Sequence, residues 1–436
     1  MNEVQLLKIA QDLVKLLTKL DISYGDMNGF SMQVSPDIFL LTAEERLALE
    51  QRGPYFWEWL AGLNQLYRNS LTNPRLDFAR QLLEAGLTEE LVAFQRNCLD
   101  EYPWLMRADQ PSLTSVCEVQ VPMSMAGWGF VTGAAVAYQA VVKTNGRTNI
   151  FPSLAKKFYQ GLGFASGKDR PVVFIPWSAK TDYRRIQQFI TQHFQGLGLK
   201  VISRDIVDLA DPAILGDIDI IYVSSKHRCD PRTSRLLLKA IEYGVRVEPP
   251  MNLLSDQKVS MIFPFLEATW DYFSDNVRSL FAPTVLIQEG AAITAANGQL
   301  MTVDEVFHSP VSVRKGFIVK YAGIDPKLKS GGAAVFRLDG SNKKSADFFS
   351  YLMRQSRQGA AWILQVNSAD RRPVTFMDRN TGSLETKDMY YRFNPFYLRS
   401  PDGQIDLVGA GICLRDQWKV HGHPDTVFQE VRFLTS

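Results

Sequence analysis

The chain has 436 residues, of which 46% are apolar, 22% charged and 11% aromatic; this composition can supply the cores of about two or three domains. Its 48 basic and 46 acidic residues give a formal net charge of +2 and are spread along the chain. This even distribution argues against nucleic acid or an anionic membrane surface as the main partner.

The four cysteines are far apart and lack C-x-x-C spacing, which argues against a zinc site or a disulfide framework. Between Met1 and Lys19, charged residues recur at near-helical spacing, so the apolar core of a signal peptide is missing. No apolar run reaches the roughly 20 residues that span a bilayer. We therefore expect a cytoplasmic protein.

Residues 1–103 are predicted to form a helical layer, because apolar side chains recur there every three or four positions. The pattern changes at Trp104. Residues 116–121 alternate as a strand does, and glycines at 127, 129 and 133 follow. We expect residues 104–165 to contain the strands that carry the site.

Residues 166–250 alternate apolar strands with amphipathic helices, the pattern of a small parallel α/β domain. Residues 251–436 are predicted to form a largely antiparallel lobe, with strands near residues 317–320, 335–338, 362–366, 374–378 and 405–413. The fold class is therefore predicted to be α/β (α+β).

Two short polar patterns could form one site. Arg107 and Asp109 are two residues apart, and so are Glu118 and Gln120. Residues i and i+2 of a strand point to the same face, so on neighbouring strands these four side chains would converge. Their oxygens suit Mg²⁺, and the arginine suits a phosphate. Spacing alone, however, favours ordinary charges on exposed strand faces.

Two lysines are candidates for phosphate contacts. Lys258 follows a Pro-Pro pair and a short polar segment, although a solvated lysine is the more common case. Lys320 ends an apolar strand and precedes Gly331 and Gly332, whose N–H groups could cradle phosphate oxygens. A simple Gly-Gly hairpin fits this spacing equally well.

The C-terminal third adds further candidates. Gln365 ends the strand WILQV and could present hydrogen-bonding groups to a purine. Arg392 and Arg415 could bind an anionic substrate or a transferring phosphate. His421 and His423 lack the neighbouring ligands of a recognised metal site, so we expect them to shape a loop.

Taken in order, these patterns resemble the synthetase domain of glutathionylspermidine synthases, a permuted branch of the ATP-grasp ligases. That family carries an R-x-D pair and an E-x-N pair, matched here by Arg107 and Asp109 and then by Glu118 and Gln120. The resemblance covers residues 104–432. One later motif is matched, with looser spacing, by Asn252, Leu254 and Lys258. The others are matched by Val319, Lys320, Gly331, Gly332, Gln365, Arg415 and Asp416.

The resemblance implies an ATP-grasp-like fold with a helical N-terminal layer and a pre-ATP-grasp-like α/β region. It also implies that ATP and Mg²⁺ activate a small-molecule carboxylate as an acyl phosphate, which an amine converts to an amide. Asp109, Glu118 and Gln120 would bind the metal. Lys258, Lys320, Gly331, Gly332 and Gln365 would bind ATP, and catalysis would fall to Arg107, Arg392 and Arg415.

Three departures limit the match. Gln120 replaces the usual asparagine, the glycine loop lacks the family's Arg-Glu, and there is no amidase half, so glutathione and spermidine specificity does not carry over.

Residues 324–331 are the predicted lid. Small-molecule kinase activity and a degenerate nucleotide-binding site remain open alternatives, whereas no G-x-G-x-x-G follows a strand as a dinucleotide site requires. A homodimer is the commonest assembly.

Overall fold

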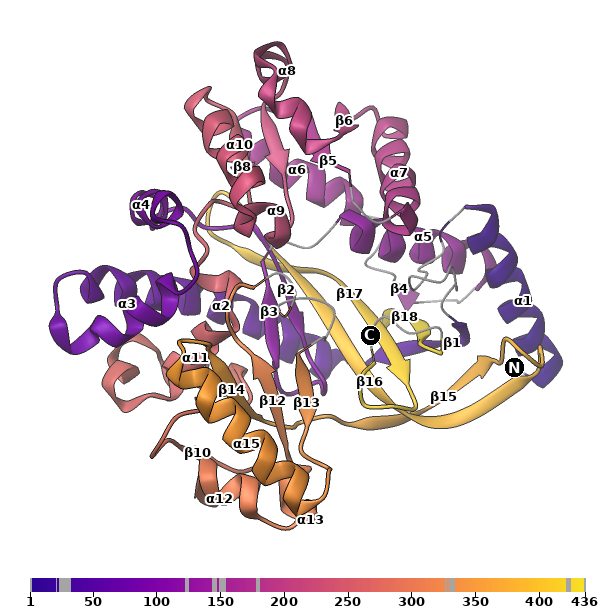
Figure 1. Cartoon of the computed structure of the whole chain (residues 1–436). Coiled ribbons are helices and arrows are strands. Elements are labelled where there is room, and N and C mark those ends of the chain that lie inside the picture. The colour runs from indigo at the N-terminus through magenta and orange to yellow at the C-terminus, as the bar shows by residue number, and fades with distance from the viewer. Residues whose placement is uncertain are drawn as a thin grey trace.

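The computed structural model describes residues 2–20, 22, 33–121, 125–142, 147–148, 154–177, 181–325, 328, 334–420 and 425–434. Within these ranges the chain forms one eight-stranded sheet, two four-stranded sheets and a two-stranded hairpin. Figure 1 shows the parallel four-stranded sheet and its helices at the top and the antiparallel one at the bottom, with the large sheet between them.

The large sheet has the strand order β1-β18-β17-β16-β2-β3, with β15 paired to β16 and β4 paired to β18. β1 and β18 run parallel, and the other pairs are antiparallel. The strands are β1 (Gln33–Leu41), β2 (Leu105–Asp109), β3 (Glu118–Gln120), β4 (Arg147–Thr148), β15 (Arg371–Met377), β16 (Leu384–Arg399), β17 (Ile405–Arg415) and β18 (Val427–Leu434).

Helices cover both faces of this sheet. The long α2 (Ala43–Ser70) packs on one face, where the hydroxyl of Tyr397 donates to the carbonyl of Leu49. On the other face lie α1 (Glu3–Lys19) and α5 (Met125–Val141), and a Cβ at Gly411 would touch Val131. A Cβ at Gly129 would lie 2.4 Å from the carbonyl oxygen of Ile186, so only glycine lets α5 approach α7 (Thr181–Gly196) this closely.

Two of the remaining N-terminal helices, η1 (Pro74–Leu76) and α3 (Asp77–Glu84), pack against α2. The third, α4 (Glu89–Asn97), packs against the parallel region, where its Leu91 joins the apolar core. The parallel sheet has the order β6-β5-β7-β8 and joins the large sheet through Trp104, on which α6 packs at Gly161. Its elements are α6 (Leu154–Ser166), β5 (Val173–Pro176), α7 (Thr181–Gly196), β6 (Val201–Arg204), η3 (Ile206–Ala210), α8 (Pro212–Asp217), β7 (Ile220–Tyr222), α9 (Ser225–Cys229), α10 (Pro231–Glu242) and β8 (Arg246–Glu248).

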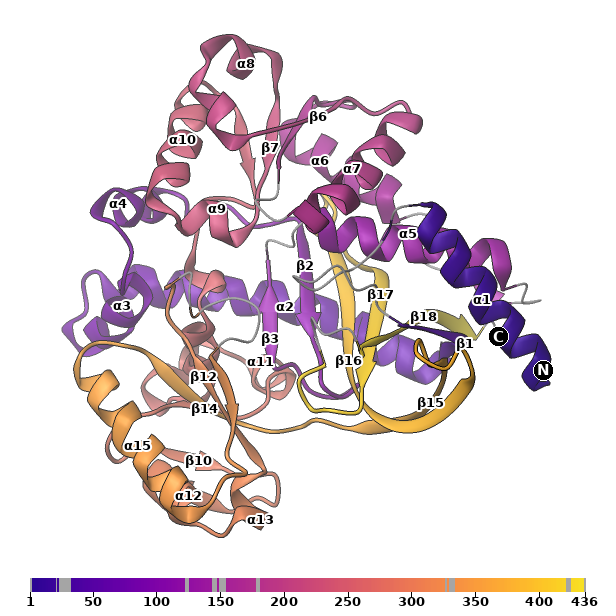
Figure 2. The same ribbon diagram turned by 45° about the vertical axis from the view of Figure 1, so that its right-hand side comes forward.

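The antiparallel sheet has the order β13-β12-β14-β9 and lies beside β3 (Figure 2). Three 3-10 helices and α11 connect it to the parallel region: η4 (Leu254–Asp256), η5 (Lys258–Phe265), η6 (Glu267–Tyr272) and α11 (Asp275–Leu280). Its own elements are β9 (Thr284–Leu286), β10 (Ala292–Thr294), β11 (Leu300–Thr302), α12 (Val303–His308), α13 (Val311–Arg314), β12 (Phe317–Tyr321), β13 (Val335–Arg337), α15 (Asn342–Arg357) and β14 (Trp362–Val366).

The predicted mixed α/β class, the parallel region and the antiparallel C-terminal strands are confirmed. The prediction of a helical layer over residues 1–103 missed β1, which lies within them and pairs with β18. One sheet therefore draws strands from the predicted regions 1–103, 104–165 and 251–436. Among the described residues, no helix combines the length and apolarity needed to cross a membrane.

Candidate functional site

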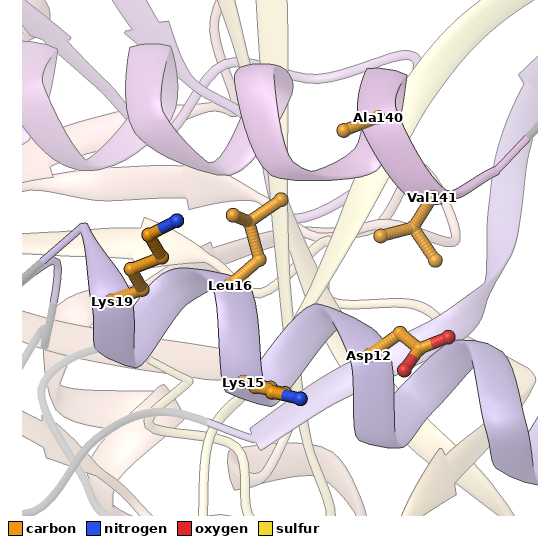
Figure 3. A pocket seen from close by; sticks show the side chains of 6 residues that line it. All are labelled: Asp12, Lys15, Leu16, Lys19, Ala140 and Val141. Carbon is orange, nitrogen blue, oxygen red and sulfur yellow. The ribbon is translucent and has the colours of Figure 1, made fainter.

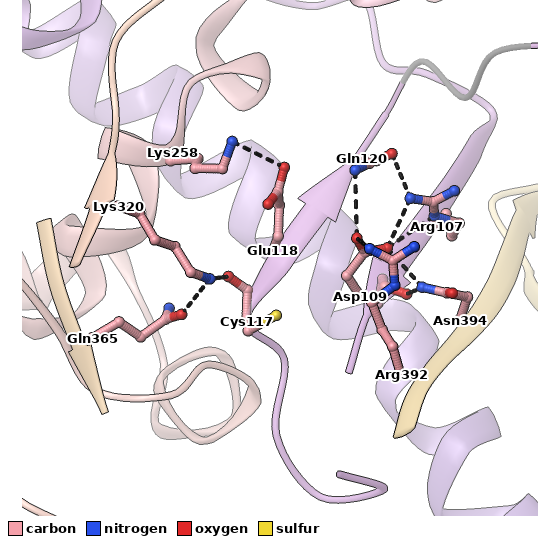
Figure 4. A network of polar contacts seen from close by, with 11 residues as sticks. Arg107, Asp109, Cys117, Glu118, Gln120, Lys258, Lys320, Gln365, Arg392 and Asn394 are labelled. Carbon is pink, nitrogen blue, oxygen red and sulfur yellow. Dashed lines mark hydrogen bonds and ion pairs between the residues drawn. The ribbon is translucent and has the colours of Figure 1, made fainter. Parts of the chain in front are cut away.

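The four polar residues of β2 and β3 share one face of the large sheet. The strands pair so that Arg107 lies opposite Gln120 and Asp109 lies opposite Glu118. The alternate residues Met106, Ala108 and Val119 belong to the apolar core on the α2 side. Alternation along the strand therefore separates a core face from a polar face, and the polar side chains converge as the sequence predicted (Figure 4).

Asp109 is the hub of this face. Its side chain is only 4% exposed, and its Oδ1 accepts hydrogen bonds from Nε of Arg107 at 2.9 Å and from Nδ2 of Asn394 at 2.7 Å. Its Oδ2 lies 3.4 Å from Nη1 of Arg392 and 3.4 Å from Nε2 of Gln120. A buried carboxylate needs such donors to offset its lost hydration.

Glu118 and Gln120 extend the site toward the edge of the sheet. The Gln120 side-chain oxygen accepts from Nη2 of Arg107 at 2.5 Å. Glu118 lies 3.2 Å from the ammonium of Lys258, which comes from η5 rather than from a strand. The pair joins the large sheet to the connecting segment that leads into the antiparallel lobe (Figure 4).

Lys320 reaches the same place from the antiparallel sheet. Its ammonium donates to the carbonyl of Cys117 at 2.9 Å and to Oε1 of Gln365 at 2.7 Å. Gln365 in turn donates to the hydroxyl of Thr284 at 2.8 Å. The Gln365 amide thus holds Lys320 in this structure, and the purine contact that the sequence suggested stays a prediction.

We call these residues the charged cluster: Arg107, Asp109, Glu118, Gln120, Lys258, Lys320, Arg392 and Asn394. Four cationic side chains face two carboxylates in it, so the cluster carries excess positive charge. The two neighbouring cysteines have pKa values raised by burial, and cations oppose the shift: Lys320 at Cys117, and Arg392 and then Arg107 at Cys413. Both thiols are therefore kept in their protonated form.

Other predicted residues lie elsewhere or outside the described ranges. Arg415 donates to Asp425 at 2.7 Å and to the carbonyl of Lys419 at 2.8 Å, so it fastens the loop after β17. Asp416 pairs with Arg371. The predicted glycine cradle and histidine loop, at residues 331–332 and 421–423, and most of the lid at 324–331, fall outside the described residues.

Sequence reasoning missed three members of the arrangement. Asn394 lies opposite Asp109 in the pairing of β16 with β2, and the carbonyl of Cys117 and the hydroxyl of Thr284 complete the Lys320 contacts. Asn394 had a usable signal, since it lies two residues after the predicted Arg392 and so on the same strand face. The backbone carbonyl of Cys117 had no such signal in the sequence, because every residue carries one.

Asp109, Glu118 and Gln120 could supply oxygen ligands to Mg²⁺ bound to phosphate, although the described residues contain no group of three His, Cys, Asp or Glu side chains of the metal-binding kind. Carboxylate and amide oxygens are the hard ligands that Mg²⁺ prefers. Glu118 and Gln120 are partly exposed, and the contacts to Oδ2 of Asp109 are long and therefore weak, which makes this oxygen the one most easily shared with a metal. The surrounding cations suit the phosphate oxygens.

A separate depression of about 340 Å³ lies between α1 and α5 (Figure 3). It is lined by Asp12, Lys15, Leu16, Lys19, Ala140 and Val141. None of these belongs to the charged cluster. The geometry therefore gives the charged cluster, and not this depression, as the candidate site.

No protein-family model and no curated protein sequence matches the chain. Among solved structures, a glutathione synthetase-like effector from Globodera pallida, determined in its apo form, matches with a TM-score of 0.60. The two sequences are 10% identical, and the match covers 100% of this chain and 98% of that one. The chain thus has a mixed α/β, ATP-grasp-like fold, as predicted. The narrower resemblance to glutathionylspermidine synthases stays a prediction.

Proposed function

We propose that this chain is an ATP- and Mg²⁺-dependent ligase that joins a small-molecule carboxylate to an amine. One observation carries the proposal: Lys320 from the antiparallel sheet, Lys258 from the connecting segment and the Asp109 face of the large sheet converge on one place. Charge-neutralising groups supplied by separate elements suit a triphosphate, because phosphoryl transfer depends on positioning and electrostatics more than on covalent help.

In this proposal each side chain has one task. Lys258 and Lys320 hold phosphate oxygens, and Arg107 and Arg392 stabilise negative charge as the phosphoryl group moves to the substrate carboxylate. Asp109, Glu118 and Gln120 would hold Mg²⁺, which neutralises charge on the phosphates when it is bound. Asn394 fixes the orientation of Asp109. The amine then displaces phosphate to complete the amide.

The test measures substrate-dependent ADP release over a panel of amino acids, peptides and polyamines, with mass analysis of the products. We expect Lys320→Ala and Asp109→Asn to abolish ADP release while the proteins stay folded. Lys343→Ala is the matched control, because Lys343 is an exposed residue of α15. A folded Lys320→Ala variant with wild-type turnover would disprove the proposal.

A second function has support from one observation. Arg107, Arg392 and Asn394 already engage Asp109 in the protein alone, which also suits a degenerate site that binds an anionic nucleotide without a metal. Calorimetry with ATP separates the two functions. A ligase requires Mg²⁺ for tight binding, whereas a degenerate site binds equally well in the presence of a chelator. A phosphorylated product without amide would instead identify a kinase.

A further inference from the structure

The segment between β8 and η5 is an irregular buried arc that ends at Lys258. It begins at Pro249 and Pro250, passes through η4 and has little regular hydrogen bonding of its own. Side chains from the helical layer brace it: Asn64 accepts from Asn252, and Gln95 accepts from the backbone N–H of Leu253. The position of Lys258 therefore depends on what fixes this arc.

Arg228 of α9 lies inside the arc and binds both of its ends. Its guanidinium donates to the carbonyls of Pro250 and Asn252, the latter at 2.7 Å, and pairs with Asp256 at 2.9 Å. The side chains of Arg228 and Asp256 are both 0% exposed. A planar guanidinium offers donors in fixed directions, so three acceptors on one arginine define the course of the backbone.

We infer that Arg228 is a positioning residue that, together with Asp256, sets Lys258 against Glu118. Lys258 follows Asp256 by two residues, and its ammonium lies 3.2 Å from Glu118. Gln257 between them is anchored by donating to the carbonyl of Leu83 at 2.6 Å. The parallel α/β region, through α9, thereby determines the geometry of a lysine in the charged cluster. The consequence for nucleotide binding rests on the proposed function.

Trace acetylation with acetic anhydride, read by mass spectrometry, tests the geometry without any nucleotide. Arg228→Lys keeps the charge but loses the planar fork, and Asp256→Asn keeps the shape but loses the charge. We expect either change to raise Lys258 acetylation about fivefold relative to Lys343, the size of one coupled contact. Arg314→Lys is the control. Arg314 is as buried as Arg228, and among the described residues it donates only to carbonyls of the antiparallel lobe, those of Phe307 and Gly340.

Unchanged Lys258 reactivity in folded Arg228→Lys and Asp256→Asn would overturn the inference, as would an equal rise in Arg314→Lys. A double-mutant cycle on binding of Mg²⁺–ATP adds a second readout. If Arg228 acts through Lys258, Arg228→Lys weakens binding in the wild-type background and has no further effect in Lys258→Ala. Additive losses would contradict a positioning role. A wild-type protein that binds no ATP would defeat the proposed function alone, because the acetylation result would still decide the inference.

Discussion

The two sides of the charged cluster hold their charges in opposite ways. On the large sheet, the cations of Arg107 and Arg392 both pair with the carboxylate of Asp109. On the antiparallel sheet, Lys320 is 4% exposed, and among the described residues its ammonium donates to the neutral oxygens of Cys117 and Gln365. Buried charges are normally paired. Lys320 is therefore the side chain best prepared to receive an anion, whereas the Asp109 side is built to keep its shape.

The largest expected effect concerns Lys320, the buried cation whose ammonium contacts neutral oxygens. We expect Lys320→Met to lower ligase turnover by about 10³-fold, because it removes a preorganised positive charge at the phosphates. The free energy of unfolding should change little, since the variant no longer buries a cation that has no carboxylate partner among the described residues, which offsets the loss of its donors to Cys117 and Gln365. Chemical denaturation beside the ADP assay measures both quantities. A marked loss of stability would show that Lys320 is a structural residue.

On the large sheet, substitution of Asp109 should instead lower the free energy of unfolding. Asp109→Asn leaves Arg107 and Arg392 without their carboxylate, and we expect it to lower the free energy of unfolding by about 3 kcal/mol. Urea denaturation measures this loss. Glu118→Gln is the comparison, because Glu118 is more exposed, with 24% of its side chain accessible. Equal stability of the Asp109→Asn variant and the wild type would remove the contrast between the two sides.

A smaller effect is expected where neutral groups hold Lys320. Gln365→Leu removes the acceptor at 2.7 Å and leaves the hydroxyl of Thr284 without its donor. We expect a loss of about 1–2 kcal/mol in the free energy of unfolding. Weaker ATP binding should accompany it, because Lys320 loses its orientation. If ATP affinity is unchanged in a folded variant, Gln365 does not position Lys320.

The smallest effect concerns a second buried carboxylate beside β2. Burial raises the pKa of Glu248 from 4.5 to about 7, although Arg246 and the N–H of Trp104 oppose the shift. A raised folded-state pKa means that the contribution to stability is present below pH 4.5 and is lost as the pH rises toward 7.

We expect Glu248→Gln to reduce this loss by about 1 kcal/mol between pH 6 and 7. Thermal or chemical unfolding over that pH range provides the measurement. Part of the pH dependence should persist, because burial also raises the pKa of Glu430 to about 7. An identical pH profile in the variant and the wild type would mean that Glu248 is not the titrating group.

The sequence predicted what depends on local spacing. Period-two placement put Arg107, Asp109, Glu118 and Gln120 on one face, and that convergence is confirmed. It did not predict β1, whose parallel partner β18 lies almost 400 residues away along the chain, because strand pairing over such a separation leaves no local pattern. The contact of Gln365 with Lys320 was missed for a related reason, since an amide near the end of a strand can face a ligand or a buried lysine equally well.

The pairing of β1 with β18 has a consequence for biosynthesis. β16, β17 and β18 lie between β1 and the strands that carry Asp109 and Glu118, and they are the last strands in chain order. On the ribosome, β1 and β2 therefore lack these partner strands, with exposed apolar faces, until residues 384–434 have emerged. Unpaired edges and exposed apolar surface promote aggregation. Newly made chains should consequently need chaperones until β18 is added.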